Sequence, residues 1–127
     1  HIAETVAASA KRRGFRKLGI TGTKYLMTGP VYSEILAKYQ LDLAIPDAST
    51  RDRIDQIIFN ELVKGIFSEQ SRQYFNSVFA GLKDRGCDAV VLGCTEVPLV
   101  VNTDDTPLPT LDSTRLLARA SLAHALV

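Results

Sequence analysis

Apolar residues recur along this chain with two spacings that alternate from one end to the other. Apolar positions three or four apart are typical of helices packed on a core, and short apolar runs bounded by turn residues are typical of strands. The helical spacing predicts helices over residues 2–13, 31–39, 49–65, 68–86 and 112–126. The short runs predict strands over "KLGIT" (17–21), "LDLAIP" (41–46) and "CDAVVLG" (87–93). The last run is apolar almost throughout, which predicts a strand buried on both faces.

The sequence predicts the buried face of the second helix and the first residue of the third helix. Val31, Ile35 and Leu36 share one face of the second helix, so we expect them in the core. Ser49 followed by Asp52 has the spacing of a capping box, which predicts that the third helix begins at Ser49.

Strands that alternate with helices predict a parallel sheet with right-handed crossovers. We therefore expect an α/β fold over residues 1–127, a single three-layer lobe with a parallel, Rossmann- or flavodoxin-like sheet of about four strands. Ligands of such sheets bind beyond the carboxyl ends of the strands. The loops expected there are "TGTKYLMTG" (21–29), "PDAST" (46–50) and "GCTEVP" (93–98), and polar candidates are concentrated in them.

Composition narrows the class of protein. The 127 residues are 46% apolar and 23% charged, a balance typical of a globular domain and not of a disordered chain. The net charge is +1 and the basic residues are scattered, so neither a nucleic-acid partner nor a membrane partner is expected. No apolar run approaches the roughly 20 residues of a membrane span. The chain opens on His1 and not on methionine, so we expect that an upstream segment is missing.

The two cysteines are expected to be free thiols. Cys87 and Cys94 flank a predicted strand, so their Cα atoms would lie about 23 Å apart, far beyond the limit of about 7 Å for a disulfide. Free thiols are typical of a reducing compartment, and we expect a cytoplasmic protein. His1 and His124 are far apart and lack acidic residues at metal-ligand spacing, so no metal site is predicted.

Cys94 is the candidate nucleophile or acid–base group. It follows a buried strand and precedes a helix start at Pro98, so backbone N–H groups and the helix dipole are expected to lower its pKa below the usual value of about 8.5. Thr95 can donate a hydrogen bond, whereas the charge of Glu96 opposes the thiolate. A small buried residue that fills a strand-to-helix corner is the competing interpretation. The residues alone leave both interpretations open.

Four segments resemble the aspartate/glutamate racemase family of cofactor-independent amino-acid racemases. "LGCTEVPLVV" (92–101) resembles the second active-site segment of that family, and "GITGTKYLMTGPVYSEIL" (19–36) resembles the start of its second lobe. "IDQIIFNELVKGIF" (54–67) resembles the helix that carries a substrate-binding lysine, and "PTLDSTRLLARASL" (109–122) resembles the closing strand and helix. Because "ELVKG" precedes "LGCTE", the aspartate racemase branch is the most similar.

The resemblance implies a role for each candidate residue. Cys94 would be one of two cysteines that exchange a proton with opposite faces of the substrate Cα, with no cofactor. Thr95 and the backbone around Glu96 would hold the α-carboxylate or α-amino end of aspartate or glutamate. Lys64 would pair with a substrate carboxylate, and Thr23 would line the same pocket.

Each role has a plainer alternative. Lys64 can be a surface cation that compensates a helix dipole, and Glu96 can be a solvated carboxylate in the first turn of its own helix. Thr23 can be a turn hydroxyl. Cys87 is expected to be structural, because it lies at the opposite end of the strand from Cys94.

The chain departs from the family in one respect. The family's other catalytic cysteine lies in an earlier lobe, and nothing in this sequence resembles that segment. The resemblance therefore implies a C-terminal lobe that is inactive alone, with a helix (residues 111–127) that packs on a missing N-terminal lobe. Asp112 or Ser113 is expected to cap this helix. Its apolar stripe predicts a homodimer or another form of self-association, and consists of Leu116, Leu117, Ala120 and Leu126.

Two other classes of function stay open. One is another reaction on the same scaffold, such as hydantoin racemisation, maleate isomerisation or arylmalonate decarboxylation. The cation of Lys64 favours a dicarboxylic amino acid over a hydantoin ring. The other class is a binding module without catalysis, such as a small flavodoxin-like receiver.

Overall fold

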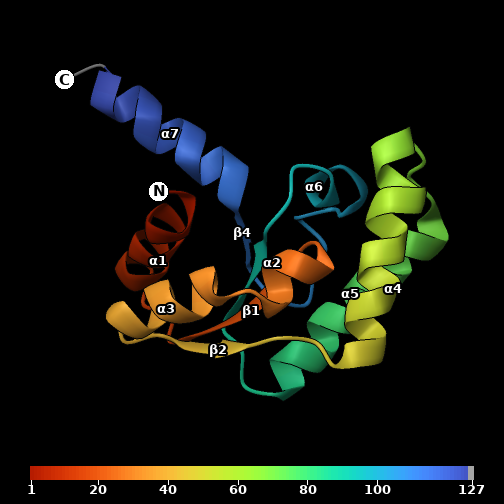
Figure 1. The fold of residues 1–127 in the computed structure, drawn as a ribbon, viewed down its shortest axis with the longest axis horizontal. Coiled ribbons are helices and arrows are strands. Elements are labelled where there is room, and N and C mark those ends of the chain that lie inside the picture. Colours follow the sequence, from red (N-terminus) through yellow and green to blue (C-terminus); the bar gives the residue numbers. More distant parts are fainter. Residues whose placement is uncertain (126–127) are drawn as a thin grey trace.

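A four-stranded parallel sheet with the order β2-β1-β3-β4 forms the centre of the computed structural model, which describes residues 1–125 (Figure 1). The strands are β1 (Lys17–Thr21), β2 (Asp42–Ala44), β3 (Ala89–Leu92) and β4 (Thr110–Asp112). All three pairings are parallel. The predicted α/β fold with about four parallel strands is confirmed.

Helices connect the strands and cover the sheet. They are α1 (Ile2–Arg12), α2 (Lys24–Thr28), α3 (Pro30–Lys38), α4 (Ala48–Asn60), α5 (Glu69–Asp84), α6 (Val97–Val100) and α7 (Ser113–Ala125), with a 3₁₀ turn, η1 (Leu62–Lys64). The short helix α2 lies in a segment that the sequence predicts as a turn. Within residues 1–125, no helix combines the length and the apolar character that a membrane crossing requires.

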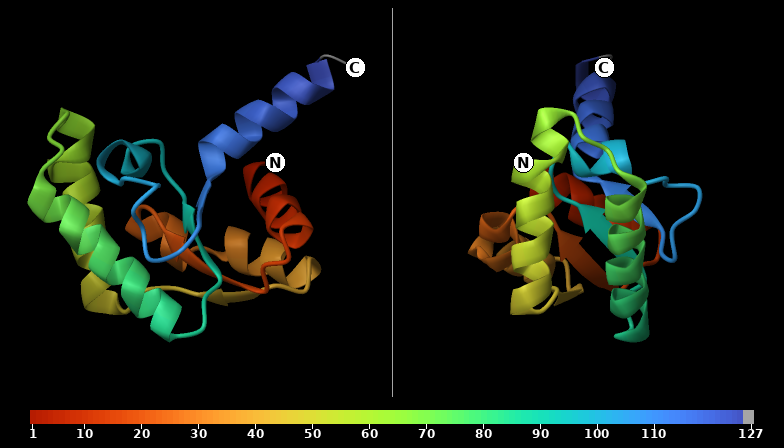
Figure 2. Two further views of the ribbon diagram at one scale, coloured as in Figure 1. Left: turned by 180° about the vertical axis from the view of Figure 1, so that it is seen from behind. Right: turned by 90° about the vertical axis from the view of Figure 1, so that its right-hand side faces the viewer.

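The helices form two layers, one on each face of the sheet. On one face, α5 lies directly on β1, because a Cβ built on Gly19 would come within 2.7 Å of Leu82 Cδ1. On the other face, α1 and α3 pack against each other. Figure 2 shows α3 and α5 on opposite sides of the strands. The chain moves toward one edge of the sheet from β1 to β2, and in the opposite direction from β2 to β3. Because both crossovers are right-handed, the helices that make these two connections lie on opposite faces.

The core forms where these layers meet the sheet. All four residues of β3 are buried, as its apolar run predicts. From α5, Phe75 and Phe79 are fully buried, with ring centroids 6.2 Å apart. Tyr74, on the same helix, is half-buried.

The predicted buried face of α3 is wrong in part. Tyr32 and Leu36 are buried, with exposed fractions of 3% and 0%, whereas Val31 is 46% exposed and Ile35 is half-buried. Residues 32 and 36 lie four apart, on the stripe that faces the core. Ile35 packs against the core beside that stripe, whereas Val31 lies off it and is exposed to solvent.

Helix α4 begins and ends at residues other than those predicted. Its N-cap is Asp47 and not Ser49, and Asp47 Oδ1 accepts from the backbone N–H of Thr50 at 2.9 Å. The Ser49 hydroxyl donates to the same oxygen at 3.1 Å, so Ser49 supports the cap. The helix stops at Asn60, and η1 ends at Lys64, where Gly65 follows as the cap in the left-handed conformation, with φ of 80°.

Helix α7 packs on α1, so residues from the two ends of the described chain lie side by side (Figure 1). Asp112 Oδ1 accepts from the N–H of Arg115 at 3.1 Å, which identifies Asp112 as the cap. In the predicted apolar stripe, Leu116 and Leu117 are half-buried and Ala120 is exposed. Leu126 and the side chain of His124 lie outside the described residues. Self-association through this helix stays a prediction.

The tightest packing lies where β1 and β3 end, and it predicts the effect of a methyl group there. A Cβ on Gly93 would lie 2.6 Å from the carbonyl oxygen of Thr21 and 2.8 Å from Leu26 Cδ2. Because backbone cannot move aside cheaply, we expect Gly93→Ala to lower the free energy of unfolding by about 1–3 kcal/mol in urea denaturation.

The matched control for that substitution is Gly81→Ala. Gly81 lies inside α5, and nothing lies within 4 Å of a Cβ built on it. We expect this variant to keep its stability or to gain up to about 1 kcal/mol, because alanine favours the helix. Equal losses in both variants would contradict the steric explanation.

Candidate active site

The carboxyl edge of the sheet brings two of the predicted loops together. Thr21 pairs with Leu92 as the last matched position of β1 and β3, and the Gly93 N–H donates to the Thr21 carbonyl at 2.8 Å. Thr23 and Cys94 each follow two residues beyond that matched pair. They therefore leave neighbouring strands at the same edge, where ligands of parallel sheets bind.

Cys94 is half-buried and packs against the edge of the core. Burial raises the pKa of its thiol, and the charge of Glu96 raises the pKa further. Hydrogen bonds with the backbone of Val97 and Glu96 act in the opposite direction and lower the pKa, but the net shift is upward. The predicted lowering is therefore wrong for this chain. The expected donors are present, but α6 has only four residues, and so short a helix has too small a dipole to offset the loss of solvation.

Buried hydroxyl groups hold the strand end beneath Cys94. Ser113 is fully buried and its Oγ donates to the Leu92 carbonyl at 2.9 Å. Thr21 Oγ1 donates to the Val91 carbonyl at 2.7 Å. Tyr32 is 3% exposed, and burial raises the pKa of Tyr32 to about 12. The hydroxyls of Thr21 and Ser113 come from β1 and α7 and fix the backbone that leads into Cys94.

The sequence did not identify this support. The sequence predicts Ser113 only as one of two possible helix caps. A hydroxyl directly after a strand was the available signal for Ser113. That signal does not predict which group Ser113 binds, because its partner, the carbonyl of Leu92, lies 21 positions earlier in the chain.

Thr23 is half-buried and caps α2, where its Oγ1 accepts from the N–H of Leu26 at 3.3 Å. Lys24 ties α2 to α4, because its backbone N–H donates to Asp55 Oδ1 at 2.7 Å and its Nζ lies 2.9 Å from Asp52 Oδ1. Thr23 also lines a hollow of about 490 Å³ that is completed by Lys24, Tyr25, Thr28, Asp55 and Phe59. The hydroxyl of Thr23 therefore has a structural role, and it borders open space.

Lys64 is exposed and lies in η1, which packs against α6 directly after Cys94 and Glu96. Glu61 fixes this turn. Its carbonyl accepts from the N–H of Lys64 at 3.0 Å, and its Oε1 accepts from the Ser71 hydroxyl at 2.6 Å. The long helix predicted through residue 65 would have placed Lys64 on a regular helical face. The helix instead breaks after Asn60, and Lys64 lies in η1, which contacts α6.

Four of the five predicted residues, Thr23, Cys94, Thr95 and Glu96, follow the ends of β1 and β3, and Lys64 lies in η1, which contacts α6. Thr95 is exposed and Glu96 is half-buried, and both lie between Cys94 and α6. The hollow beside Thr23 does not include Cys94 or Lys64 in its lining. Cys87, at the other end of β3, is buried, and desolvation raises the pKa of its thiol.

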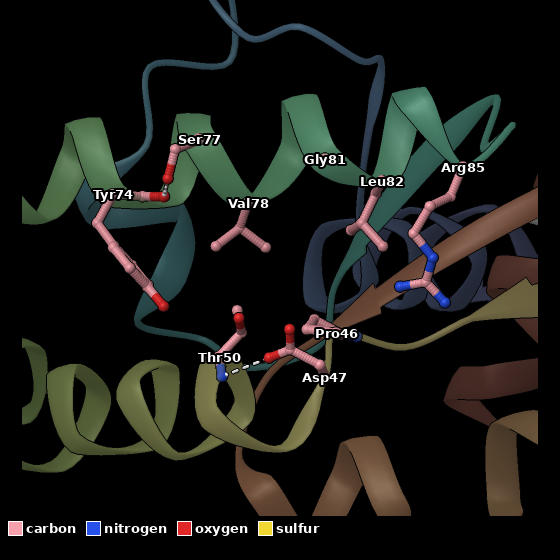
Figure 3. A pocket seen from close by; sticks show the side chains of 9 residues that line it. All are labelled: Pro46, Asp47, Thr50, Tyr74, Ser77, Val78, Gly81, Leu82 and Arg85. Carbon is pink, nitrogen blue, oxygen red and sulfur yellow. Dashed lines mark hydrogen bonds between the residues drawn. The ribbon is translucent and has the colours of Figure 1, made fainter.

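A second hollow, of about 240 Å³, lies away from these residues, between the start of α4 and α5 (Figure 3). Its charged groups already have partners, since Asp47 caps α4 and Arg85 Nη1 donates to the Ile45 carbonyl at 2.8 Å. Within residues 1–125, no three side chains of the metal-ligating types lie close enough together to hold an ion. The carboxyl edge therefore remains the best-supported site.

The raised pKa of Cys94 gives a test by alkylation. At about pH 7 we expect iodoacetamide to modify Cys94 more slowly than a cysteine in an unstructured peptide, with the rate rising as the pH increases toward about 10. Glu96→Gln removes a charge that raises the pKa, so the rate at fixed pH should increase about twofold to tenfold. Mass spectrometry of the digested protein separates Cys94 from Cys87, the internal control. A faster reaction than that of the peptide at pH 7 would contradict the raised pKa.

Comparison with known proteins places these observations in a family. The model of the Asp/Glu/Hydantoin racemase family matches residues 1–121. Over 94 residues, 74% of this chain and 33% of the relative, the chain is 24% identical to the glutamate racemase of Pseudomonas aeruginosa.

Two crystal structures share the fold closely. A protein from Yersinia pestis that has been proposed to be an Asp/Glu racemase is 35% identical, with a TM-score of 0.94 over 100% of this chain and 56% of that one. An aspartate racemase homologue from Pyrococcus horikoshii is 28% identical, with a TM-score of 0.90 over 99% of this chain and 55% of that one. The chain thus spans about half the length of these structures and a third of the curated relative. These findings confirm the resemblance, and the chain belongs to the Asp/Glu/Hydantoin racemase family.

Proposed function

We propose that this chain supplies one half of the active site of an amino-acid racemase that acts on aspartate or glutamate without a cofactor. The observation that carries the proposal is the position of Cys94, half-buried at the carboxyl edge of the sheet, in a chain of this family. Inversion of a stereocentre needs a base on one face of Cα and an acid on the other. Cys94 provides one of these two groups.

The second group must come from outside this chain. Cys87 is the other thiol of the chain, but it is 4% exposed and lies before β3, whereas Cys94 lies after it. Apolar side chains near the Cys94 edge support a facing half, since Tyr25 is 86% exposed and Leu99 is 62% exposed. Together with the coverage of 56% of the Yersinia pestis chain, this favours a site that two halves share.

The raised pKa suits Cys94 to the acid role in the free chain. Burial keeps the sulfur protonated near neutral pH, and a thiol delivers the proton that a thiol–thiolate pair needs on one face. A substrate α-ammonium group beside the sulfur would lower the pKa, which allows the same residue to act as a base in the reverse direction.

Lys64 is the proposed determinant of a dicarboxylic substrate. It is exposed beside α6, and the turn that carries it is fixed by Glu61. A lysine cation stabilises a second carboxylate and gives nothing comparable to a hydantoin ring. The family includes both substrate types, so Lys64 is the residue that favours aspartate or glutamate here.

A proton-exchange experiment tests the two-group mechanism. The 127-residue chain, incubated with L-aspartate in deuterium oxide, should neither lose the α-proton signal nor form D-aspartate, because it holds no second thiol at the edge. In a longer protein that contains this chain and a facing thiol, Cys94→Ser should lower exchange by about 10²- to 10⁴-fold. Cys87→Ser is the matched control and should leave exchange unchanged. Sustained D-aspartate formation by the pure chain would reject the two-thiol requirement.

A second experiment tests substrate choice in that longer protein. Lys64→Ala should lower kcat/KM for aspartate by about tenfold to a hundredfold, the loss expected for a charge-assisted hydrogen bond. Turnover of a neutral hydantoin, if present, should not change. Lys38→Ala, in the last turn of α3, is the matched control for a lysine that only compensates a helix dipole. Equal effects of both substitutions would reject the binding role of Lys64.

A further inference from the structure

The peptide group between Leu92 and Gly93 is held from both sides. Leu92 is the last residue of β3, the strand that lies between β1 and β4 (Figure 1). The Leu92 carbonyl accepts from the Ser113 hydroxyl at 2.9 Å. The Gly93 N–H donates to the Thr21 carbonyl at 2.8 Å. Both polar groups of this peptide therefore have a partner, one at the end of β1 and one at the start of α7.

The bond between Ser113 and Leu92 is formed away from water. Both residues are fully buried, with exposed fractions of 0%. A buried carbonyl without a donor is unfavourable, so its direction is set by the donor that lies within reach. Ser113 supplies that donor and thereby fixes the direction in which the Leu92 carbonyl points.

Gly93 makes this support necessary. A side chain does not fit at position 93, because a Cβ there would lie 2.6 Å from the Thr21 carbonyl oxygen. Glycine restricts φ and ψ less than any other residue, so the end of β3 alone does not determine where the chain goes next. A fixed peptide before Gly93 limits that freedom, and with it the positions that Cys94 can take.

The loop that carries Cys94 has few other anchors. Cys94 and Thr95 belong to no helix or strand, and over residues 1–125 their N–H and C=O groups make no hydrogen bond with another backbone group. The sulfur lies within hydrogen-bond reach of the backbone of Glu96 and Val97. A rotation at Gly93 would therefore move the sulfur relative to those donors and to a bound substrate.

We propose that Ser113 is a positioning residue for Cys94, whose hydroxyl acts through the Leu92 carbonyl to set the place of the sulfur at the carboxyl edge of the sheet. Ser113 acts through the backbone of residues 92 and 93 and not by a bond with Cys94 itself. The consequence for catalysis rests on the proposed racemase function, whereas the consequence for the thiol of this chain does not.

Alkylation of Cys94 in the 127-residue chain tests the positioning. Ser113→Ala removes the donor without adding bulk, so the loop should loosen and the sulfur should become more accessible. At about pH 7 we expect iodoacetamide to modify Cys94 about threefold to tenfold faster than in the unsubstituted chain, because burial is what slows this thiol. Ser113→Thr keeps the hydroxyl and should restore the original rate.

The matched control is Ile57→Val in α4. Ile57 is fully buried, and the loss of one methyl group should lower the urea midpoint about as much as Ser113→Ala does. The alkylation rate of Cys94 should not change in this control, which separates positioning from a general loss of stability. Three results would overturn the proposal: an unchanged rate in Ser113→Ala, an equal rise in Ile57→Val, or a rate in Ser113→Thr as high as in Ser113→Ala.

Steady-state kinetics of a longer protein that contains this chain and a facing thiol test the consequence for catalysis. Ser113→Ala should lower kcat for aspartate about tenfold to a hundredfold with KM unchanged, because a displaced proton-transfer group slows the reaction and not binding. Ser113→Thr should restore kcat, and an unchanged kcat in Ser113→Ala would overturn the role in catalysis. Absence of racemisation in the unsubstituted longer protein would instead reject the proposed function alone, since the alkylation rates test Ser113 without it.

Discussion

The close approach of two backbones at the carboxyl edge of the sheet is the constraint on which the rest of this structure depends. The Gly93 N–H donates to the Thr21 carbonyl at 2.8 Å, and no side chain at position 93 fits between the two strands. Because β1 and β3 are parallel neighbours, this contact sets the loops after both strands beside each other. Thr23 and Cys94 leave the sheet at adjacent points for this reason. The hydroxyl of Ser113, bonded to Leu92, holds the same strand end from the other side.

At Cys94, burial competes with local backbone polarity, and burial has the larger effect. The backbone groups of Glu96 and Val97 favour the thiolate, but the loss of solvation favours the thiol. A cation bound at this edge would shift the balance toward the thiolate, so the protonation of Cys94 and the occupancy of the edge are linked. A thiol that changes its protonation state with occupancy suits a residue that must give and take a proton in turn.

Among the described residues, side chains without a packing or charge partner occur in two separate places on the molecule. They are apolar in one place and positively charged in the other. Near the carboxyl edge, apolar side chains such as Tyr25 and Leu99 are exposed. Between α1 and α7, Arg13, Arg115 and Arg119 line one small cavity. A net charge of +1 does not reveal the second place, because acidic residues elsewhere balance it in the total. Local clustering, and not composition, decides where charge of one sign gathers.

The sequence by itself determined the elements and the edge that carries the site. β1, β3 and α5 begin and end within two residues of the predicted bounds, because apolar spacing, turn residues and caps are local features. The family motif around Cys94 also lies within a single segment. Only the tertiary structure decided the inward turn of Ser113, the raised pKa of Cys94 and the meeting of Arg13 with α7. Burial and charge at those positions come from residues far away in the chain, and the local pattern of a sequence carries no record of which distant residues will meet.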